Sequence, residues 1–245
     1  MSKSITKDEE LKMIDKRKNY VMVLDTETCN GITEDDGSVD LDYSIVYDGG
    51  FSIVDTKGNV YEEHSYVMGD VFCGMKDLMK SAYYAEKIPN YWDDIKAKTR
   101  TMISFNHFRN IVWDKIREYN ITAIVAHNAR FDVRALNNTC RYLTKSKIRW
   151  FFPRGMEVWD SLMMARSVVG RMPTYQRFCA DNGYMTAHTV PQCRFTAEVL
   201  YRFITKDTTF EESHTALEDV KIEREIMWYC YRQKQPMKKI LYAGR

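Results

Sequence analysis

The chain has 245 residues, enough for one large α/β domain, or two small ones, with a sizeable hydrophobic core. Its 36 basic and 34 acidic residues leave a net charge of +2, which excludes a polycation that coats nucleic acid without specificity. The hydrophobic fraction of 44% and the charged fraction of 29% are typical of a globular protein in water. These values fit an enzyme that engages the end of a nucleic-acid strand, but they fit equally proteins that never meet nucleic acid.

Cysteine usage and the lack of long apolar runs predict a cytoplasmic protein with no membrane partner. The six cysteines are scattered without a Cys-x-x-Cys pair, and residues 1–10 lack the apolar core of a signal peptide. No apolar run approaches the length of a membrane span. Cys179, His188 and Cys193, with the distant Cys140, could bind zinc, but isolated buried thiols and a loop histidine explain them better.

The first 120 residues contain both strand and helix signals. After a charged lead-in at 1–18, the apolar, β-rich run 20–25 predicts a strand buried in a central sheet. A loop rich in glycine and aspartate follows, and the turn sequence Asp-Thr-Lys-Gly-Asn then joins strands 45–54 and 59–67 into a hairpin. Helical stretches come next. One of them has an apolar face formed by Phe105, Phe108, Val112, Ile116 and Tyr119.

The second half of the chain adds two strands and a long final helix. Run 121–126 predicts a strand, followed by a helix that begins just before Asp132. Residues 157–159 predict a last strand, followed by helix-capping residues at 160 and 161. A Thr-x-x-Glu capping box at 215–218 starts a helix that ends near residue 232.

The domain organisation predicted from these signals is simple. The sequence contains no internal repeat and no linker rich in proline or glycine. We therefore expect one domain at 19–235, between the lead-in at 1–18 and a basic tail at 236–245.

Five candidate catalytic residues lie in three separate segments: Asp25, Glu27, Asp132, His214 and Asp219. Residues two apart on a strand project from the same face, so Asp25 and Glu27 can enter one cleft. Alone, Asp132 would be an acid that favours a helix N-terminus, and His214 and Asp219 would more often be a loop histidine and a surface acid. Together, four converging acids would repel one another unless divalent cations lay between them. That arrangement predicts metal-assisted cleavage of phosphodiesters.

The order of these residues resembles the DEDD superfamily of 3′–5′ exonucleases, in its histidine-bearing (DEDDh) branch. This branch includes the proofreading subunit of bacterial replicative polymerases, ribonuclease T and oligoribonuclease. The family motifs Asp-x-Glu-Thr, His-Asn-x-x-Phe-Asp and His-x-Ala-x-x-Asp are matched at 25–28, 127–132 and 214–219. A tyrosine-bearing sister branch would place Tyr where this chain has Thr215.

The chain also departs from the compact family pattern. The stretch 66–121 is longer than usual, and 172–203 resembles nucleases encoded by bacteriophages. The resemblance therefore implies the cytoplasm of a bacterium or of a phage-infected host. Several relatives are dimers, so a homodimer is a further expectation.

The resemblance implies an RNase H-like α/β fold, with a mixed central β-sheet of about five strands and helices on both sides. It implies a site for two Mg²⁺ ions roughly 3.5–4 Å apart, for which Mn²⁺ can substitute. By resemblance, Asp25 bridges both ions, Glu27 and Asp219 complete the first, and Asp132 supports the second. His214 would act as general base. The products would be nucleoside 5′-monophosphates released from the free 3′ end of single-stranded DNA or RNA.

Candidate substrate contacts are Thr26, Thr28, His127 and Asn128. Family members cradle the terminal nucleotide near the two threonines, whereas His127 and Asn128 either bind near the scissile phosphate or only tie their loop together. Aromatic and basic residues are interleaved at 83–100, and basic residues gather at 141–154 and in the tail. These stretches could follow a nucleic-acid backbone, but helix packing and solvated charge explain most of them.

Three alternatives remain open from the sequence. The chain could be an exoribonuclease confined to short oligoribonucleotides, a non-catalytic module that binds nucleic acid or protein, or an RNase H-type endonuclease. The complete set of five residues disfavours the binding module, and the His-x-Ala-x-x-Asp segment disfavours the endonuclease.

Overall fold

The computed structural model describes residues 14–33, 39–82, 84–145, 147 and 149–244. Most of the predicted lead-in, and Tyr83 of the aromatic and basic stretch, lie outside the described residues. The strands are β1 (Tyr20–Cys29), β2 (Ile32–Thr33), β3 (Val39–Asp40), β4 (Ile45–Asp55), β5 (Val60–Met68), β6 (Thr101–Ile103), β7 (Ala123–Ala126), β8 (Glu157–Asp160) and β9 (Ile240–Tyr242). The α-helices are α1 (Gly69–Phe72), α2 (Lys76–Met79), α3 (Ile88–Ala97), α4 (Phe105–Glu118), α5 (Arg130–Leu143), α6 (Ser161–Val168), α7 (Pro173–Asp181), α8 (Ala197–Thr205) and α9 (Ala216–Arg232). Short 3₁₀ helices occur at Ala85–Lys87 and Val169–Arg171.

The central sheet confirms the predicted fold class. Its strand order within the described residues is β6-β5-β4-β1-β7-β8-β9. The strands β1, β4 and β5 form an antiparallel meander, and β7 and β8 continue parallel to β1. These five strands form the mixed core of an RNase H-like sheet.

Two short edge strands extend the sheet beyond the five strands that the sequence predicts. At one edge β6 pairs with β5, and at the other β9 pairs with β8. Strand β9 comes from segment 236–245, which the sequence treats as a basic tail. Part of this segment is therefore a sheet strand.

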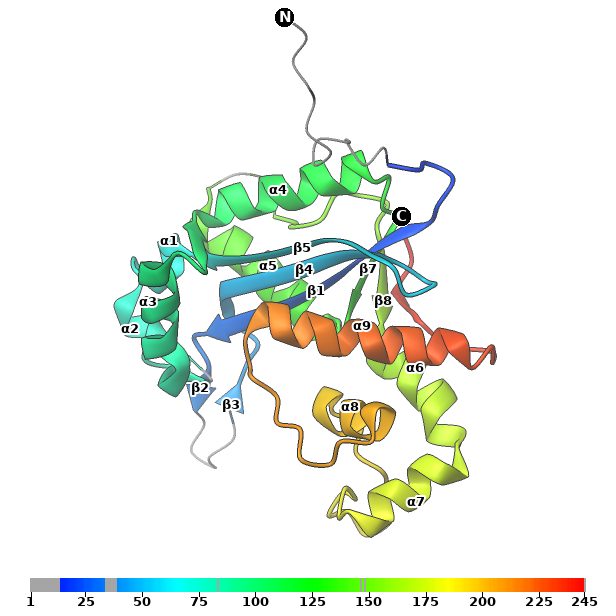
Figure 1. Ribbon diagram of the computed structural model, residues 1–245. Coiled ribbons are helices and arrows are strands. Elements are labelled where there is room, and N and C mark those ends of the chain that lie inside the picture. Colours follow the sequence, from blue (N-terminus) through cyan, green and yellow to red (C-terminus); the bar gives the residue numbers. More distant parts are fainter. Residues whose placement is uncertain (1–13, 34–38, 83, 146, 148, 245) are drawn as a thin grey trace, which may run out of the picture.

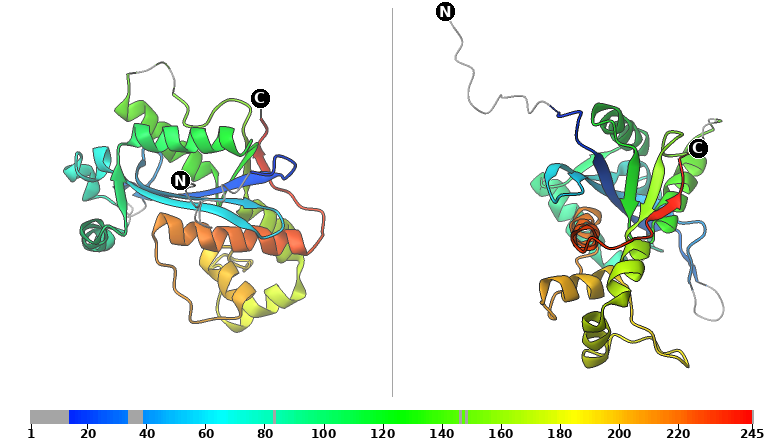
Figure 2. Two further views of the ribbon diagram at one scale, coloured as in Figure 1. Left: turned by 45° about the horizontal axis from the view of Figure 1, so that its top comes forward. Right: turned by 90° about the vertical axis from the view of Figure 1, so that its right-hand side faces the viewer.

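Helices cover both faces of the sheet (Figures 1 and 2). Helices α4 and α5 pack on one face, and α6 and α9 on the other, with α7 and α8 lying outside α9. Among the described residues, none of these helices is both long and apolar enough to cross a membrane.

The alternation of side chains along β1 explains where its acids point. Met22 and Leu24 are buried against α4 and α5, whereas Val21 and Val23 are buried in the core that includes α6, α8 and α9. Because side chains alternate between faces, Asp25 continues the face of Val21 and Val23. The strand thus directs its first candidate metal ligand toward the start of α9.

The final helix has the predicted bounds but not the predicted cap. Helix α9 spans Ala216–Arg232, yet the side chain of Thr215 makes no capping hydrogen bond. Instead, the backbone N–H of Ala216 donates to Oδ2 of the buried Asp48 on β4, over 3.3 Å. A carboxylate from a distant strand therefore stabilises the helix N-terminus, as its dipole favours.

Gly50 allows the start of α9 to lie directly on the sheet. In register it faces Asp25 on β1, and a Cβ at Gly50 would lie 2.6 Å from the Leu217 nitrogen and 2.7 Å from the Ala216 carbonyl carbon. These are backbone atoms, which cannot move without shifting the helix. The missing side chain thus brings Asp219, in the first turn of α9, close to the acids of β1.

We predict that Gly50→Ala lowers the free energy of unfolding by about 1–3 kcal/mol, the usual cost of overpacking. The matched control is Gly49→Ala on the opposite face. Its Cβ would meet the ends of side chains, Phe108 Cζ at 2.8 Å and Met68 Cε at 3.0 Å, which can shift. Urea denaturation of both variants checks the prediction, and an equal loss in the two would contradict it.

Candidate active site

A cleft of about 1260 Å³ opens where β1 and β7 end and where α5 and α9 begin. Ligand sites of α/β sheets commonly lie outside the carboxyl ends of the parallel strands. Every catalytic and substrate-binding candidate that the sequence analysis names lines this cleft. The catalytic candidates are Asp25, Glu27, Asp132, His214 and Asp219, and the substrate-binding candidates are Thr26, Thr28, His127 and Asn128.

Three of the candidate metal ligands meet closely in the cleft. One carboxylate oxygen from each of Asp25, Glu27 and Asp219 lies within 4.8 Å of the others. The first two come from β1, and the third from the first turn of α9. Three oxygens at this spacing can contact one cation, so these side chains are correctly placed to hold a divalent metal ion.

Asp132 lies beside this group on the first turn of α5. Its side chain is buried, and its Oδ1 accepts a hydrogen bond of 2.8 Å from the hydroxyl of Thr26. The hydroxyl of Thr26, whose backbone is the predicted substrate contact, thus orients Asp132. The charge of Asp132 also raises the pKa of Asp25, so the fourth acid belongs to the same electrostatic cluster.

Burial and mutual repulsion raise the pKa values of these acids. Burial, followed by the nearby charge of Asp48, raises the pKa of Glu27 to about 8. Burial, followed by the charge of Glu212, raises the pKa of Asp219 to about 9. Burial raises the pKa of Asp132 to about 7, and burial and neighbouring carboxylates also raise that of Asp25. Within the described part of the chain, none of the largest causes of these shifts is a neighbouring positive charge.

The donor set fits a hard divalent cation. Oδ1 of Asp219 is buried and has no hydrogen-bond partner among the residues described. Buried carboxylate oxygens normally have a donor or a cation beside them, because the unpaired state is costly. Mg²⁺ and Mn²⁺ prefer carboxylate oxygens, so the residues present match these ions.

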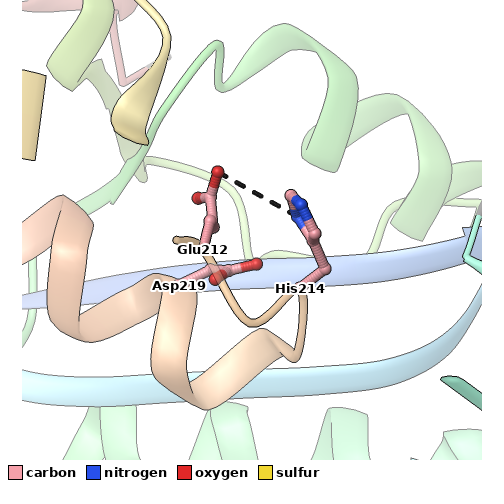
Figure 3. A group of neighbouring side chains, drawn as sticks. All are labelled: Glu212, His214 and Asp219. Atoms are coloured by element: carbon pink, nitrogen blue, oxygen red, sulfur yellow. Dashed lines mark ion pairs between the residues drawn. The ribbon is translucent and has the colours of Figure 1, made fainter. Parts of the chain in front are cut away.

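His214 lies at the rim of the acidic cluster, beside Glu212 and Asp219 (Figure 3). Its ring stacks on that of Tyr84, with centroids 3.9 Å apart and planes inclined by 12°. Its Nδ1 lies 4.0 Å from Oε2 of Glu212. Burial, followed by the charge of Lys87, lowers the pKa of His214. A neutral imidazole, able to accept a proton, is therefore favoured near pH 7.

His127 uses both ring nitrogens inside the protein. Its Nε2 lies 2.8 Å from the Phe195 carbonyl oxygen, which can only accept, so Nε2 carries the proton. Its Nδ1 then accepts a hydrogen bond of 2.8 Å from the hydroxyl of Ser161. The neighbouring Asn128 donates its backbone N–H to Oδ1 of Asp160, over 3.0 Å. These contacts favour the loop-tying interpretation of both residues over a phosphate contact.

Sequence reasoning missed three side chains around the site, Asp48, Glu212 and Glu223, and it placed Tyr84 in an aromatic and basic stretch without linking it to His214. Glu212, Glu223 and Tyr84 line the cleft, whereas Asp48 is buried on β4 opposite Glu27. For Glu223 a signal was present, because it follows Asp219 by four residues on the same helix and must share its face. The others depend on strand pairing and loop positions that no local pattern reveals.

Some residues with alternative functional readings are structural. Tyr91 and Arg100 of the aromatic and basic stretch both donate to Oδ2 of Asp48, at 2.8 and 2.9 Å. Cys140 and Cys179 are buried in the cores on opposite faces of the sheet, so they cannot share a zinc ion. Hydrogen bonds to Asp48 account for Tyr91 and Arg100, and core packing accounts for Cys140 and Cys179.

Comparison with known proteins gives distant structural matches only. No family model matches the sequence, and no curated protein matches it. Among solved structures, E. coli exonuclease I in complex with a dT13 oligonucleotide has a TM-score of 0.49 at 14% identity, covering 89% of this chain and 41% of that chain. The zinc-bound form of the E. coli exonuclease I complex with single-stranded DNA has a TM-score of 0.48 at 14% identity, with the same coverage. The Mg²⁺- and Mn²⁺-bound form of S. pombe Pop2p has a TM-score of 0.46 at 15% identity, covering 87% of this chain and 83% of that chain. The chain thus spans about two fifths of the exonuclease I structures that it matches.

Proposed function

We propose that this chain is a metal-dependent 3′–5′ exonuclease of the histidine-type DEDD family. It hydrolyses phosphodiester bonds at the 3′ end of single-stranded DNA or RNA and releases nucleoside 5′-monophosphates. The observation that carries the proposal is the meeting of Asp25, Glu27 and Asp219 in one cleft, with Asp132 beside them and His214 at the rim. Three segments far apart in the sequence bring these acids together, with Glu27, Asp132 and Asp219 buried, at an electrostatic cost that bound cations would offset.

The proposed roles of the side chains follow from their positions. Two divalent cations, Mg²⁺ or in its place Mn²⁺, would activate the attacking water and stabilise the charge on the departing 3′ oxygen. Asp25, Glu27 and Asp219, with Asp132 beside them, would hold these cations through their carboxylates. Thr26 would hold Asp132 in place through its hydrogen bond.

His214 is proposed to take the proton from the attacking water. Its lowered pKa favours the neutral ring that this role requires, and the stack on Tyr84 restrains the plane of the ring. Thr28 and the open part of the cleft would contact the terminal nucleotide.

The rival functions have less support. A non-catalytic binding module has no need to gather four acids in one cleft, three of them buried. The cleft volume, at about 1260 Å³, exceeds the roughly 300–1,000 Å³ of small-molecule sites and favours the end of a strand. An exoribonuclease restricted to short oligoribonucleotides remains the second candidate, because its chemistry would be the same.

The decisive test is degradation of matched DNA and RNA strands that carry a label at the 3′ or the 5′ end. With Mg²⁺ present, we expect the 3′ label to leave at once as a mononucleotide, while the 5′-labelled strand shortens gradually. Excess chelator is expected to stop both reactions.

Two control substrates and a binding measurement separate the rivals. A circular single strand is expected to remain intact, and its cleavage would indicate an endonuclease. Cleavage of a trimer without cleavage of a long strand would indicate the oligoribonucleotide enzyme. Binding of strands without any cleavage in Mg²⁺ or Mn²⁺ would indicate the binding module and would overturn the proposal.

A further inference from the structure

Glu223 is a buried carboxylate in the cleft that the motifs do not include. It lies on α9, one turn after Asp219, and its exposed fraction is only 2%. Its Oε1 accepts a hydrogen bond of 2.9 Å from the backbone N–H of His127. Its Oε2 is buried without any hydrogen-bond partner in the described part of the chain. One oxygen is therefore anchored to the end of β7, and the other is left unpaired.

The surroundings of Glu223 are acidic. After burial, the charge of Glu223 is the largest cause of the raised pKa of Asp25, ahead of Asp132, Glu27 and Asp219. For Glu223 itself, burial and then the charge of Asp132 raise the pKa. Glu223, Asp25 and Asp132 thus line the same cleft and belong to one electrostatic cluster.

The nearest basic residue in sequence does not compensate this charge. The guanidinium of Arg224 pairs with Glu63 on β5 and contacts Ser52 on β4. An unpaired, buried carboxylate oxygen is costly, so it needs either a bound proton or a cation. A cluster that already holds four acids makes the cation the better solution, because one ion can serve several carboxylates.

We propose that Glu223 is a fifth carboxylate of the cation site and binds a divalent, oxygen-preferring cation on the side of Asp25 and Asp132. This inference rests on the proposed function only in assuming that the acidic cluster holds cations. The hydrogen bond from His127 fixes the carboxylate in advance, as outer contacts commonly do for metal ligands. Cation binding would also secure the loop that follows β7, since Glu223 contacts its backbone.

The test is a calorimetric titration of the whole chain with Mn²⁺, comparing the wild type with Glu223→Gln. Glutamine keeps an oxygen that can accept from the His127 N–H, but it removes the negative charge. We expect Mn²⁺ affinity to fall by at least about tenfold, since even an outer-shell contact of a metal site is worth 10–100-fold. The matched control is Glu218→Gln, an exposed acid on the same helix that pairs with Lys221. Its Mn²⁺ affinity is expected to equal that of the wild type.

Each outcome of the titration decides whether Glu223 is a metal ligand or a protonated structural residue. Equal affinity of the wild type and Glu223→Gln would show that Glu223 is a protonated structural residue, and the inference would fall. Should Glu223→Gln not fold, Glu223→Asp gives the same comparison. Its carboxylate is drawn back by one methylene and is expected to bind Mn²⁺ more weakly, and unchanged affinity would again overturn the inference.

Failure of the proposed function would look different. If the wild type binds Mn²⁺ through Glu223 but cleaves no strand, the cation site is supported and the proposed exonuclease activity is wrong. If the wild type cleaves strands but binds Mn²⁺ independently of Glu223, the proposed exonuclease activity is supported and the inference about Glu223 is wrong. A wild type that binds no Mn²⁺ would remove both.

Discussion

Asp25→Asn is expected to reduce cleavage of a 3′-labelled single strand to background while leaving the protein folded. The charges of Glu223, Asp132, Glu27 and Asp219 all raise the pKa of Asp25, so its carboxylate interacts with each of the other acids. Asparagine has the same shape but supplies no charge for the cations between these carboxylates. Cation binding, and the catalysis that depends on it, would then be lost with little change in packing.

The fold of this variant can be checked independently of its activity. Because burial and then repulsion raise the pKa of Asp25 in the native state, its ionised form is disfavoured there, and removing the charge should not lower stability near pH 7. We expect Asp25→Asn to melt, in chelator, at the temperature of the wild type or above it. Asp114→Asn, an exposed acid on α4 that pairs with Arg117, is the control and should keep full activity. Full activity in Asp25→Asn would remove the metal mechanism.

The central part of the fold could be predicted from the sequence because its signals are local. The run that became β1 is apolar, the hairpin of β4 and β5 has a recognisable turn, and α9 ends at the predicted residue. The edge strands β6 and β9 could not be predicted in this way. Each has three residues with partly exposed side chains, and each exists because a longer strand already offers unpaired backbone groups.

The candidate site was predictable where a motif places its residues together, and less so where contacts depend on tertiary structure. All the named candidates line one cleft, because the three motifs end β1, follow β7 and begin α9. The hydrogen bond from Thr26 to Asp132 spans 106 positions of sequence, so no local pattern could assign that hydroxyl to a carboxylate. Asp48 was equally hidden, since its roles at Tyr91, Arg100 and the start of α9 arise only after the strands pair.

His214→Ala is expected to lower kcat on a single-stranded substrate by about 10²–10⁴-fold, the usual contribution of a positioned general base. The expectation follows from a ring that is held against Tyr84 and whose lowered pKa leaves a nitrogen free of a proton near neutral pH. Single-turnover rates with saturating substrate and Mg²⁺ measure the loss directly. His188→Ala is the matched control, because His188 also lines the cleft but is exposed. Its kcat should change little.

The position of His214 allows a second explanation of a slow variant, which the same protein can test. His214, Glu212 and Asp219 lie close enough to share a metal ion, so alanine could act by weakening cation binding. A general base predicts that Mn²⁺ affinity of His214→Ala equals that of the wild type, whereas a metal ligand predicts a fall of at least about tenfold. An unchanged rate would deny His214 either role. If the variant is slow and also binds Mn²⁺ more weakly, His214 is a metal ligand and not the general base. One ring nitrogen cannot bind a cation and accept a proton at once.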